Sequence, residues 1–235
     1  MHHDDLDLAR LTAEATPAAL AGWHRDHAVG EEVAVHGIWL GPVSFESVAL
    51  GAGTTILDAT SGLGRGQWTL RREPTLPDLV APLMRVLIVG LNPSVYSAER
   101  GVAFARPGNR FWPAAIAAGL VSEDRDPWAA FGAGVGFTDL VKRASAKADG
   151  LTRAEYSIGS ERLHDLVAWL KPRVVCFAGI TGYRSAIDRH AQVGHQPSDF
   201  AGAITYVMPN PSGVNAHASL VDLVTHFTAV KRLSA

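Results

Sequence analysis

The chain has 235 residues, of which 47% are hydrophobic, enough to bury a large core, and its formal net charge is −2. A single cysteine excludes an internal disulfide, a paired-cysteine zinc site and a four-cysteine iron–sulfur cluster. No apolar run reaches the length of a membrane span, and the acidic N-terminus lacks a signal peptide's apolar core, so we expect a cytoplasmic protein with no membrane association.

Charge divides the chain into two parts. Residues 1–83 hold 5 Lys and Arg against 11 Asp and Glu, whereas residues 84–235 hold 16 against 12. The second part therefore has a modest net charge of +4, which permits contacts with phosphates without proving them.

The first part is predicted to form a small α+β extension. Residues 5–28 have the apolar spacing of a helix, and residues 31–73 contain short strand-like runs between glycines, which predict a small antiparallel sheet. These runs cover residues 33–40, 43–45, 54–57 and 67–70. A Pro-rich connector follows over residues 73–82, so we expect an N-terminal extension of unknown role over residues 1–80 and a second domain over residues 81–235.

One segment of the extension resembles the strand and glycine loop of a methyl-donor-binding domain. It runs from Thr55 to Gly66 and ends in Gly62-Leu63-Gly64-Arg65-Gly66. Such a loop must open a helix inside a full doubly wound sheet, and here Pro74 and Pro77 intervene. We therefore interpret the segment as a hairpin or a degenerate remnant, and we expect no cofactor there.

From Met84 onward, predicted strands and helices alternate. Buried strands are predicted over residues 85–89, 173–178 and 204–208, and helices over residues 111–120, 153–170, 182–191 and 217–233. The strand runs are apolar without alternation, which indicates strands covered on both faces. The predicted fold is a three-layer α/β/α domain with a central, mainly parallel sheet.

Two Asn-Pro turns leave the ends of predicted strands, Asn92-Pro93 after the first and Asn210-Pro211 after the third. Loops at the carboxyl ends of parallel strands converge on one crevice, so the two turns are expected to border one active site. Pro93 restricts the backbone of Asn92, which aims its amide. An amide is no strong base, but it can hold a water or orient a substrate. A simple strand-capping turn is the alternative.

The segment after the first turn carries an aromatic ring and two cations. Phe104 is able either to stack on a flat heterocycle or to pack in the core. Arg106 and Arg110 are weak candidates for phosphate contacts, with a solvated surface as the alternative. Asn109 is a candidate cap for the helix predicted from residue 111.

The loop over residues 209–215 is stiff, with two prolines and one glycine, Gly213. Val214 places an apolar side chain at its tip, as base extrusion from a duplex requires. The alternative is an ordinary strand–helix connection in which Asn215 caps the helix predicted from His217.

Four segments together closely resemble the mismatch-specific uracil/thymine-DNA glycosylase family. They are residues 90–93 (Gly-Leu-Asn-Pro), 104–112 (Phe-Ala-Arg-Pro-Gly-Asn-Arg-Phe-Trp), 136–141 (Gly-Phe-Thr-Asp-Leu-Val) and 209–213 (Pro-Asn-Pro-Ser-Gly). The resemblance implies that Asn92 positions the attacking water, that Phe104 stacks on the flipped base and that Asn210 lies in the second active-site motif. The other implied residues line the base pocket or fill the space that the base leaves: Leu91 and Ser97, and Gly213, Val214 and Asn215.

The chain departs from the family's pattern at three positions. Ser94 stands where the family often has glycine, Tyr96 is bulkier than expected beside the pocket, and Ala216 falls where a relative can carry a basic contact. These departures bear on the width of the pocket and on which bases fit it.

The resemblance implies a monofunctional DNA glycosylase that flips a mismatched or damaged base from double-stranded DNA and hydrolyses its N-glycosidic bond. Uracil opposite G is the first candidate substrate, followed by thymine, hypoxanthine and alkylated cytosine. We expect a monomer that uses no cofactor. We also expect no metal site, because the histidines lack the spacing of paired ligands. The alternatives are a non-catalytic DNA- or nucleotide-binding module that keeps the fold and, with less support, a nucleoside hydrolase.

Overall fold

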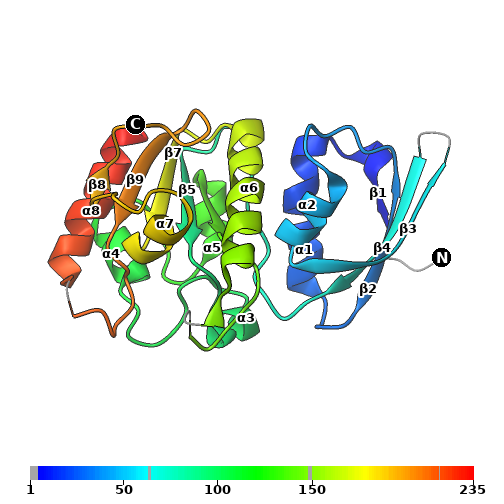
Figure 1. Cartoon of the computed structure of the whole chain (residues 1–235). Helices are drawn as coiled ribbons and strands as arrows, with labels where there is room; N and C mark the ends of the chain where they lie inside the picture. The colour runs from blue at the N-terminus through cyan, green and yellow to red at the C-terminus, as the bar shows by residue number, and fades with distance from the viewer. Residues whose placement is uncertain (1–4, 63–64, 148–149, 217) are drawn as a thin grey trace.

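The computed structural model describes residues 5–62, 65–147, 150–216 and 218–235. They form two parts that lie side by side, a smaller N-terminal part in blue to cyan and a larger part in green to red (Figure 1). Each part is built on its own β-sheet.

The N-terminal part is a four-stranded sheet with two helices. Its strands are β1 (Leu6–Asp7), β2 (Glu32–Gly37), β3 (Thr54–Gly62) and β4 (Arg65–Arg72), in the spatial order β1-β2-β4-β3. The helical segments are two 3-10 turns (Leu8–Arg10 and Ala13–Ala15), α1 (Thr16–Asp26) and α2 (Phe45–Gly51). β4 is antiparallel to both of its neighbours, which confirms the small antiparallel sheet predicted for this region.

Two predictions for the N-terminal part are wrong. Residues 5–28 do not form one helix: the Thr12 hydroxyl caps a 3-10 turn, and Pro17, which has no N–H to donate, lies in the first turn of α1. The run at residues 43–45 is no strand, because the Ser44 side chain caps α2.

The segment that resembles a cofactor-binding loop is a hairpin. β3 and β4 pair antiparallel, with a register shift between Ile56 and Asp58. Leu63 and Gly64, in the middle of the expected glycine loop, lie outside the described residues. Among the described residues, the element after β3 is the strand β4 and not a helix. The arrangement therefore differs from a strand and glycine loop that open a helix.

The larger part is a five-stranded sheet in the order β6-β5-β7-β9-β8. Its strands are β5 (Val86–Gly90), β6 (Val135–Asp139), β7 (Val174–Ala178), β8 (Gly194–His195) and β9 (Ile204–Met208). Its helices are α3 (Val95–Arg100), α4 (Phe111–Ala117), α5 (Pro127–Gly132), α6 (Arg153–Leu170), α7 (Ile180–Ala186) and α8 (Leu220–Leu233). All neighbouring strands are parallel except β8, so the predicted, mainly parallel sheet is confirmed.

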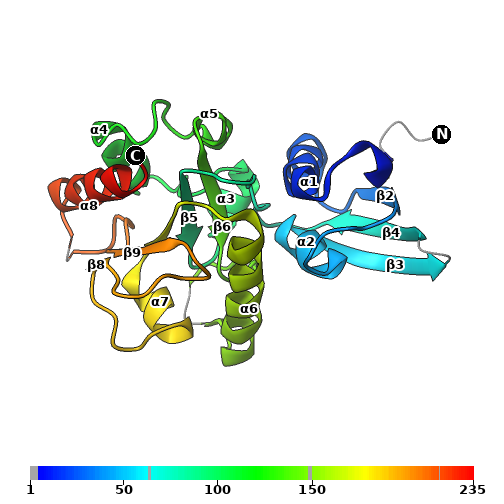
Figure 2. The same ribbon diagram turned by 90° about the horizontal axis from the view of Figure 1, so that it is seen from above.

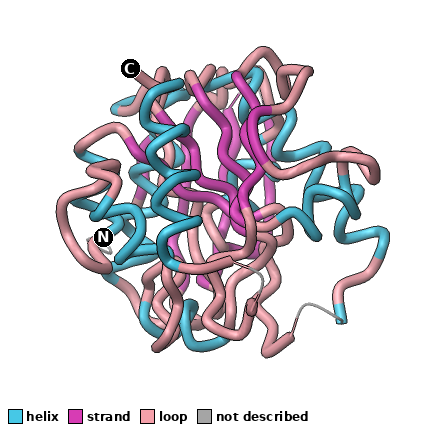
Figure 3. Tube along the Cα trace, turned by 90° about the vertical axis from the view of Figure 1, so that its left-hand side faces the viewer, coloured by secondary structure: helices cyan, strands magenta, loops and turns pink. Residues whose placement is uncertain are grey.

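Helices cover both faces of this sheet. On β5, Val86 and Ile88 point to one face, and Leu87 and Val89 to the other, and all four are buried. α4, α5 and α8 pack on the first face, and α6 and α7 on the second. Figures 2 and 3 show the strands between the two helical layers. The predicted three-layer α/β/α architecture is therefore confirmed, and burial on both faces explains the uninterrupted apolar runs.

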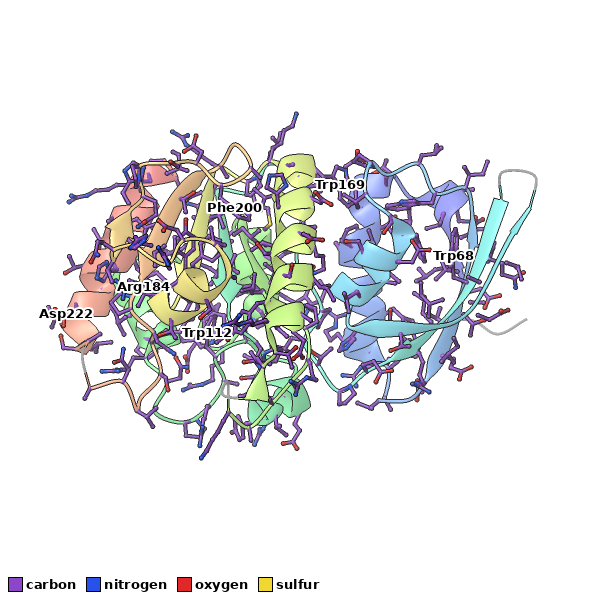
Figure 4. All side chains as sticks on the ribbon, viewed as in Figure 1. Trp68, Trp112, Trp169, Arg184, Phe200 and Asp222 are labelled. Atoms are coloured by element: carbon purple, nitrogen blue, oxygen red, sulfur yellow. The ribbon has the colours of Figure 1, made fainter. Side chains whose placement is uncertain are left out.

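The two parts meet at α6. Trp169 on α6 lies next to the N-terminal part (Figure 4), with its ring edge-on to that of Trp39 at a centroid distance of 5.9 Å. Leu79, in the connector, exchanges two backbone hydrogen bonds with Phe137 of β6. The connector is thus attached to the sheet of the larger part, and the boundary after residue 80 stays a prediction. Among the described helices, none combines the length and the apolar character needed to cross a membrane.

Candidate active site

The carboxyl ends of β5, β7 and β9 border a cavity of about 220 Å³. α3, which directly follows β5, marks this end of the sheet at the lower edge of Figure 1. β5 leads into the first Asn-Pro turn and β9 into the second, and both turns reach the cavity. Six of the predicted site residues line it: Leu91, Asn92, Ser97, Phe104, Arg106 and Asn210.

Asn92 is held by its amide nitrogen. Its Nδ2 donates to the carbonyl groups of Pro93 (3.2 Å) and Arg143 (3.0 Å) and to Ser145 Oγ (2.8 Å). Because carbonyl oxygens only accept, the nitrogen must face them and Oδ1 must face away. Oδ1 makes no hydrogen bond to any described residue. The amide oxygen is therefore fixed at the cavity wall, where it can accept a hydrogen bond from a water or a ligand.

Phe104 contributes an aromatic wall. Its half-buried ring stacks on the fully buried ring of Phe111, with centroids 4.2 Å apart and an interplanar angle of 10°, and it also lines the cavity. Its backbone is left-handed, with φ at 57°, which costs a non-glycine residue about 1 kcal/mol or more. The Phe104 ring therefore packs on the core and also borders the cavity, and its stacking on a flat heterocycle stays a prediction.

Ser94, a departure from the family's pattern, caps a helix. Its Oγ accepts from Ser97 N (3.1 Å) and donates to Ser97 Oγ (3.0 Å), which fixes the start of α3 beside the cavity. Ser97 is buried, and its hydroxyl also accepts from Ala105 N (3.3 Å). Tyr96 is not among the residues that line this cavity: its ring lies under the guanidinium of Arg100, 5.3 Å from the ring centroid.

The loop after β9 is tied by its own side chains. Asn210 Oδ1 accepts from Ser212 N (2.9 Å), and Asn215 Nδ2 donates to the Asn210 carbonyl (2.8 Å). Gly213 lies against Gly108 so closely that a Cβ on Gly213 would collide with the Gly108 carbonyl. Glycine is therefore required where the loop meets the segment that follows Phe104 in the chain.

The Arg110 side chain binds the loop after β9. Its guanidinium donates to the carbonyl groups of Ser212 (2.8 Å), Asn215 (2.7 Å) and Ala218. These bonds turn the side chain onto the loop, so the predicted phosphate contact has no support from its position. Arg106, by contrast, is exposed beside the cavity, where its phosphate contact stays a prediction.

Val214 stands at the exposed tip of this tied loop, with 88% of its surface accessible. The alternative gave Asn215 the cap of a helix from His217, a residue that lies outside the described ones. α8 begins at Leu220, where Ser219 and Asp222 form a reciprocal capping box. An exposed apolar side chain on a braced loop fits the wedge interpretation of Val214.

Asp139 also lines the cavity, although no role in the site was predicted for it from the sequence. It ends β6, pairs in register with Gly90 of β5, and lines the cavity with only 9% of its surface accessible. A Cβ on Gly90 would collide with Asp139 Oδ1. Burial raises the pKa of this carboxyl to about 6. Asn92 was found because a polar residue follows an apolar strand. Asp139 is a polar residue at the end of β6, so the same signal would find it once residues 135–139 are recognised as a strand.

The fold and the cavity define an α/β protein with a ligand site at the carboxyl ends of parallel strands, where open sheets bind their ligands. Residues 77–232, about two thirds of the chain, match the sequence model of the Uracil DNA glycosylase superfamily. The chain belongs to this superfamily, whose members are DNA glycosylases. The match begins inside the segment assigned above to the N-terminal extension.

Solved structures are similar to part of the chain. One of them is the solution NMR structure of a Methanosarcina acetivorans protein provisionally named a uracil DNA glycosylase, which is 22% identical. The similarity covers 67% of this chain and 97% of that one, with a TM-score of 0.44. At this level the likeness carries no argument, and the family assignment rests on the sequence match.

Proposed function

We propose that the protein is a mismatch-specific DNA glycosylase that acts as a monomer on double-stranded DNA and leaves an abasic site. The observation that carries this proposal is the fixed amide of Asn92: its Oδ1 lacks a partner among the described residues at a cavity that the Phe104 ring also lines. A rigid acceptor beside a flat apolar surface suits a water held next to a stacked base.

Base flipping would use the loop after β9. Val214 enters the space that the base leaves, while the bonds from Arg110 to the loop carbonyls keep the wedge from collapsing. Extrusion costs a few kcal/mol and is least costly at a mismatch, which is the basis for selecting mismatched bases. We expect Arg106, exposed beside the cavity, and Lys147, exposed on another loop that lines it, to contact the DNA backbone.

Hydrolysis would proceed with a water held by Asn92 Oδ1 near the sugar carbon. An amide orients this water but does not take its proton strongly, so the bond to the base must loosen before attack. We therefore expect slow turnover and a preference for bases that leave readily. Uracil opposite G is the first expected substrate, with thymine, hypoxanthine and alkylated cytosine as further candidates.

Asp139 is our candidate for reading the edge of the base. A protonated carboxyl donates one hydrogen bond and accepts another, which complements the adjacent carbonyl and N–H of uracil. The ionised form only accepts. Because the pKa of Asp139 is raised to about 6, uracil removal should fall as the pH rises through this value.

The test is a lesion panel: duplexes with each candidate base opposite each normal base are incubated with the protein and scored for abasic sites. Asn92→Ala should abolish base release while keeping most of the DNA affinity. Ser157→Ala, an exposed position on α6, is the control and should behave as the wild type. Wild-type binding without release on every duplex would instead support the non-catalytic binding module. Full activity of Asn92→Ala would refute the role of Asn92.

A further inference from the structure

A buried ion cluster lies next to the cavity. Asp78, in the connector, accepts hydrogen bonds from Lys142 Nζ (2.8 Å), from Thr138 Oγ1 (2.6 Å) and from the guanidinium of Arg162. The side chains of Asp78, Lys142 and Arg162 are only 4–5% exposed. Two buried cations thus share one hydrogen-bonded anion, which leaves one positive charge unbalanced within the cluster.

Asp139 carries the carboxyl group next to this ion cluster. The Arg162 guanidinium, besides binding Asp78, donates to the Asp139 carbonyl (2.7 Å), which joins the cluster to the end of β6. Burial has the largest influence on the Asp139 carboxyl and raises its pKa; Lys142 and Arg162 lower it, and Asp78 raises it. The charge of Asp139 therefore depends on how far Asp78 neutralises the two cations.

The N-terminal part holds Asp78 in place. Asp78 N donates to the Gly51 carbonyl (2.7 Å) at the end of α2, and a Cβ on Gly51 would stand 2.5 Å from Asp78 Oδ2. The Thr75 hydroxyl donates to the Lys142 carbonyl. Leu76, between these residues, lines the same cavity as Asp139. The N-terminal part and the connector thus reach both the cluster and the cavity wall.

Two charged groups, Arg106 and Lys147, line the first cavity together with Asp139. The other charged groups near Asp139 line a second cavity of about 360 Å³ between the two parts, which Asp139 also lines. They are His24 and Arg25 of α1, Arg72 of β4, Glu99 and Arg100 of α3, and Arg125 and Asp126. None of them hydrogen-bonds to the Asp139 carboxyl within the described residues. Burial, with help from Arg72 and Lys142, lowers the pKa of His24 to about 3, so His24 stays neutral while Asp139 titrates.

We propose that Asp78 is a positioning residue for the base pocket: through Lys142 and Arg162 it sets the charge that Asp139 presents to the substrate base. The connector is then a component of the active site, and the N-terminal part supports it through the Gly51 carbonyl. This inference rests on the proposed function, because it takes Asp139 to face the base. It also implies that residues 81–235 alone would lack the anion that Lys142 and Arg162 require.

The experiment uses the full chain with ¹³C-labelled aspartate and follows the Asp139 carboxyl by NMR as the pH is changed. In Asp78→Asn, two cations face Asp139 without their anion, so its titration midpoint should fall by about one pH unit or more. Lys142→Met removes a cation, and the midpoint should rise. The double variant Asp78→Asn/Lys142→Met restores the wild-type charge count and should return the midpoint toward the wild-type value. Asp165→Asn, an exposed position on α6, should leave it unchanged.

The pH profile of uracil release should move in the same direction as each midpoint. If Asp78→Asn does not fold, the opposite shift in Lys142→Met and its reversal in the double variant still decide the matter. A midpoint that is equal in the wild type and in both single variants would overturn the inference. Absence of base release from the wild type would defeat the proposed function alone, since the NMR shifts would remain.

Discussion

Gly90 and Asp139 are paired across β5 and β6, and the Asp139 carboxyl occupies the space that a side chain on residue 90 would need. The cavity thus depends on an absent Cβ at the end of one strand and a buried carboxyl at the end of its neighbour. The Phe104 ring lies just beyond, 3.7 Å from the position of that Cβ.

Gly90→Ala should therefore damage the site. The new Cβ must displace Asp139, and we expect the free energy of unfolding to fall by about 1–3 kcal/mol, as in other overpacked cores. Base release should fall at least about tenfold, since a misplacement of about 1 Å can cost a hundredfold. The matched control is Gly132→Ala, where a Cβ meets nothing within 4 Å. Urea denaturation and an abasic-site assay measure both effects, and equal values for the two variants would contradict the packing argument.

The buried Asp139 carboxyl also predicts how stability changes with pH. Its pKa rises from 3.8 when unfolded to about 6 when folded, so the folded state binds the proton more tightly. The resulting stabilisation is complete below pH 4 and is lost as the pH rises through 6. Asp139→Asn removes this dependence.

We expect the variant to gain on the wild type between pH 4 and pH 7, by up to about 3 kcal/mol from a shift of about two pKa units. Urea denaturation at a series of pH values measures the difference. If the difference in unfolding free energy between variant and wild type stays constant from pH 4 to pH 7, Asp139 titrates as an exposed carboxyl does. In the abasic-site assay, the amide should also preserve uracil release above pH 6, because it keeps one donor and one acceptor.

The parts of the fold that the sequence predicted well carry strong local signals. Residues 153–170 were predicted as one helix and form α6, which starts at a Thr152–Glu155 capping box and stops before Pro172. β9 was found because its apolar run is uninterrupted. β6 was missed because Gly136 and Thr138 interrupt its apolar pattern, and with it Asp139 was lost as a strand-end residue.

From the sequence, only those features of the site that follow from the sheet topology could be predicted. The two Asn-Pro turns meet because parallel strands end at the same edge of the sheet, a rule that needs no coordinates. No such rule predicts the ion cluster around Asp78. Asp78 and Arg162 are 84 residues apart, and their contact depends on how the connector packs against α6. The role of Arg110 likewise depends on a loop about 100 residues further along the chain.

The orientation of Asn92 predicts that a stronger base does not help at this position. A carboxylate in Asn92→Asp would place an anionic oxygen against the carbonyl groups of Pro93 and Arg143, where Nδ2 now donates. Two hydrogen bonds are lost, and oxygen faces oxygen, at a cost of about 1–3 kcal/mol in stability. Despite its higher basicity, the variant should release uracil more slowly than the wild type at pH 7.5. Faster release would show that a water-activating base, and not the fixed amide, limits the reaction.

Arg110 and Arg106 should behave differently when each is replaced by alanine. Arg110→Ala frees three loop carbonyl groups and loosens the support of Val214, so base flipping should weaken while the salt dependence of DNA binding stays unchanged. Arg106→Ala should instead reduce the slope of log affinity against log salt by about 1, since one phosphate contact is lost. Fluorescence of 2-aminopurine beside a mismatch measures flipping, and anisotropy titrations at several salt concentrations measure the slope. A reduced salt slope in Arg110→Ala would restore the phosphate contact as its role, because an arginine that braces the loop does not release counterions from DNA.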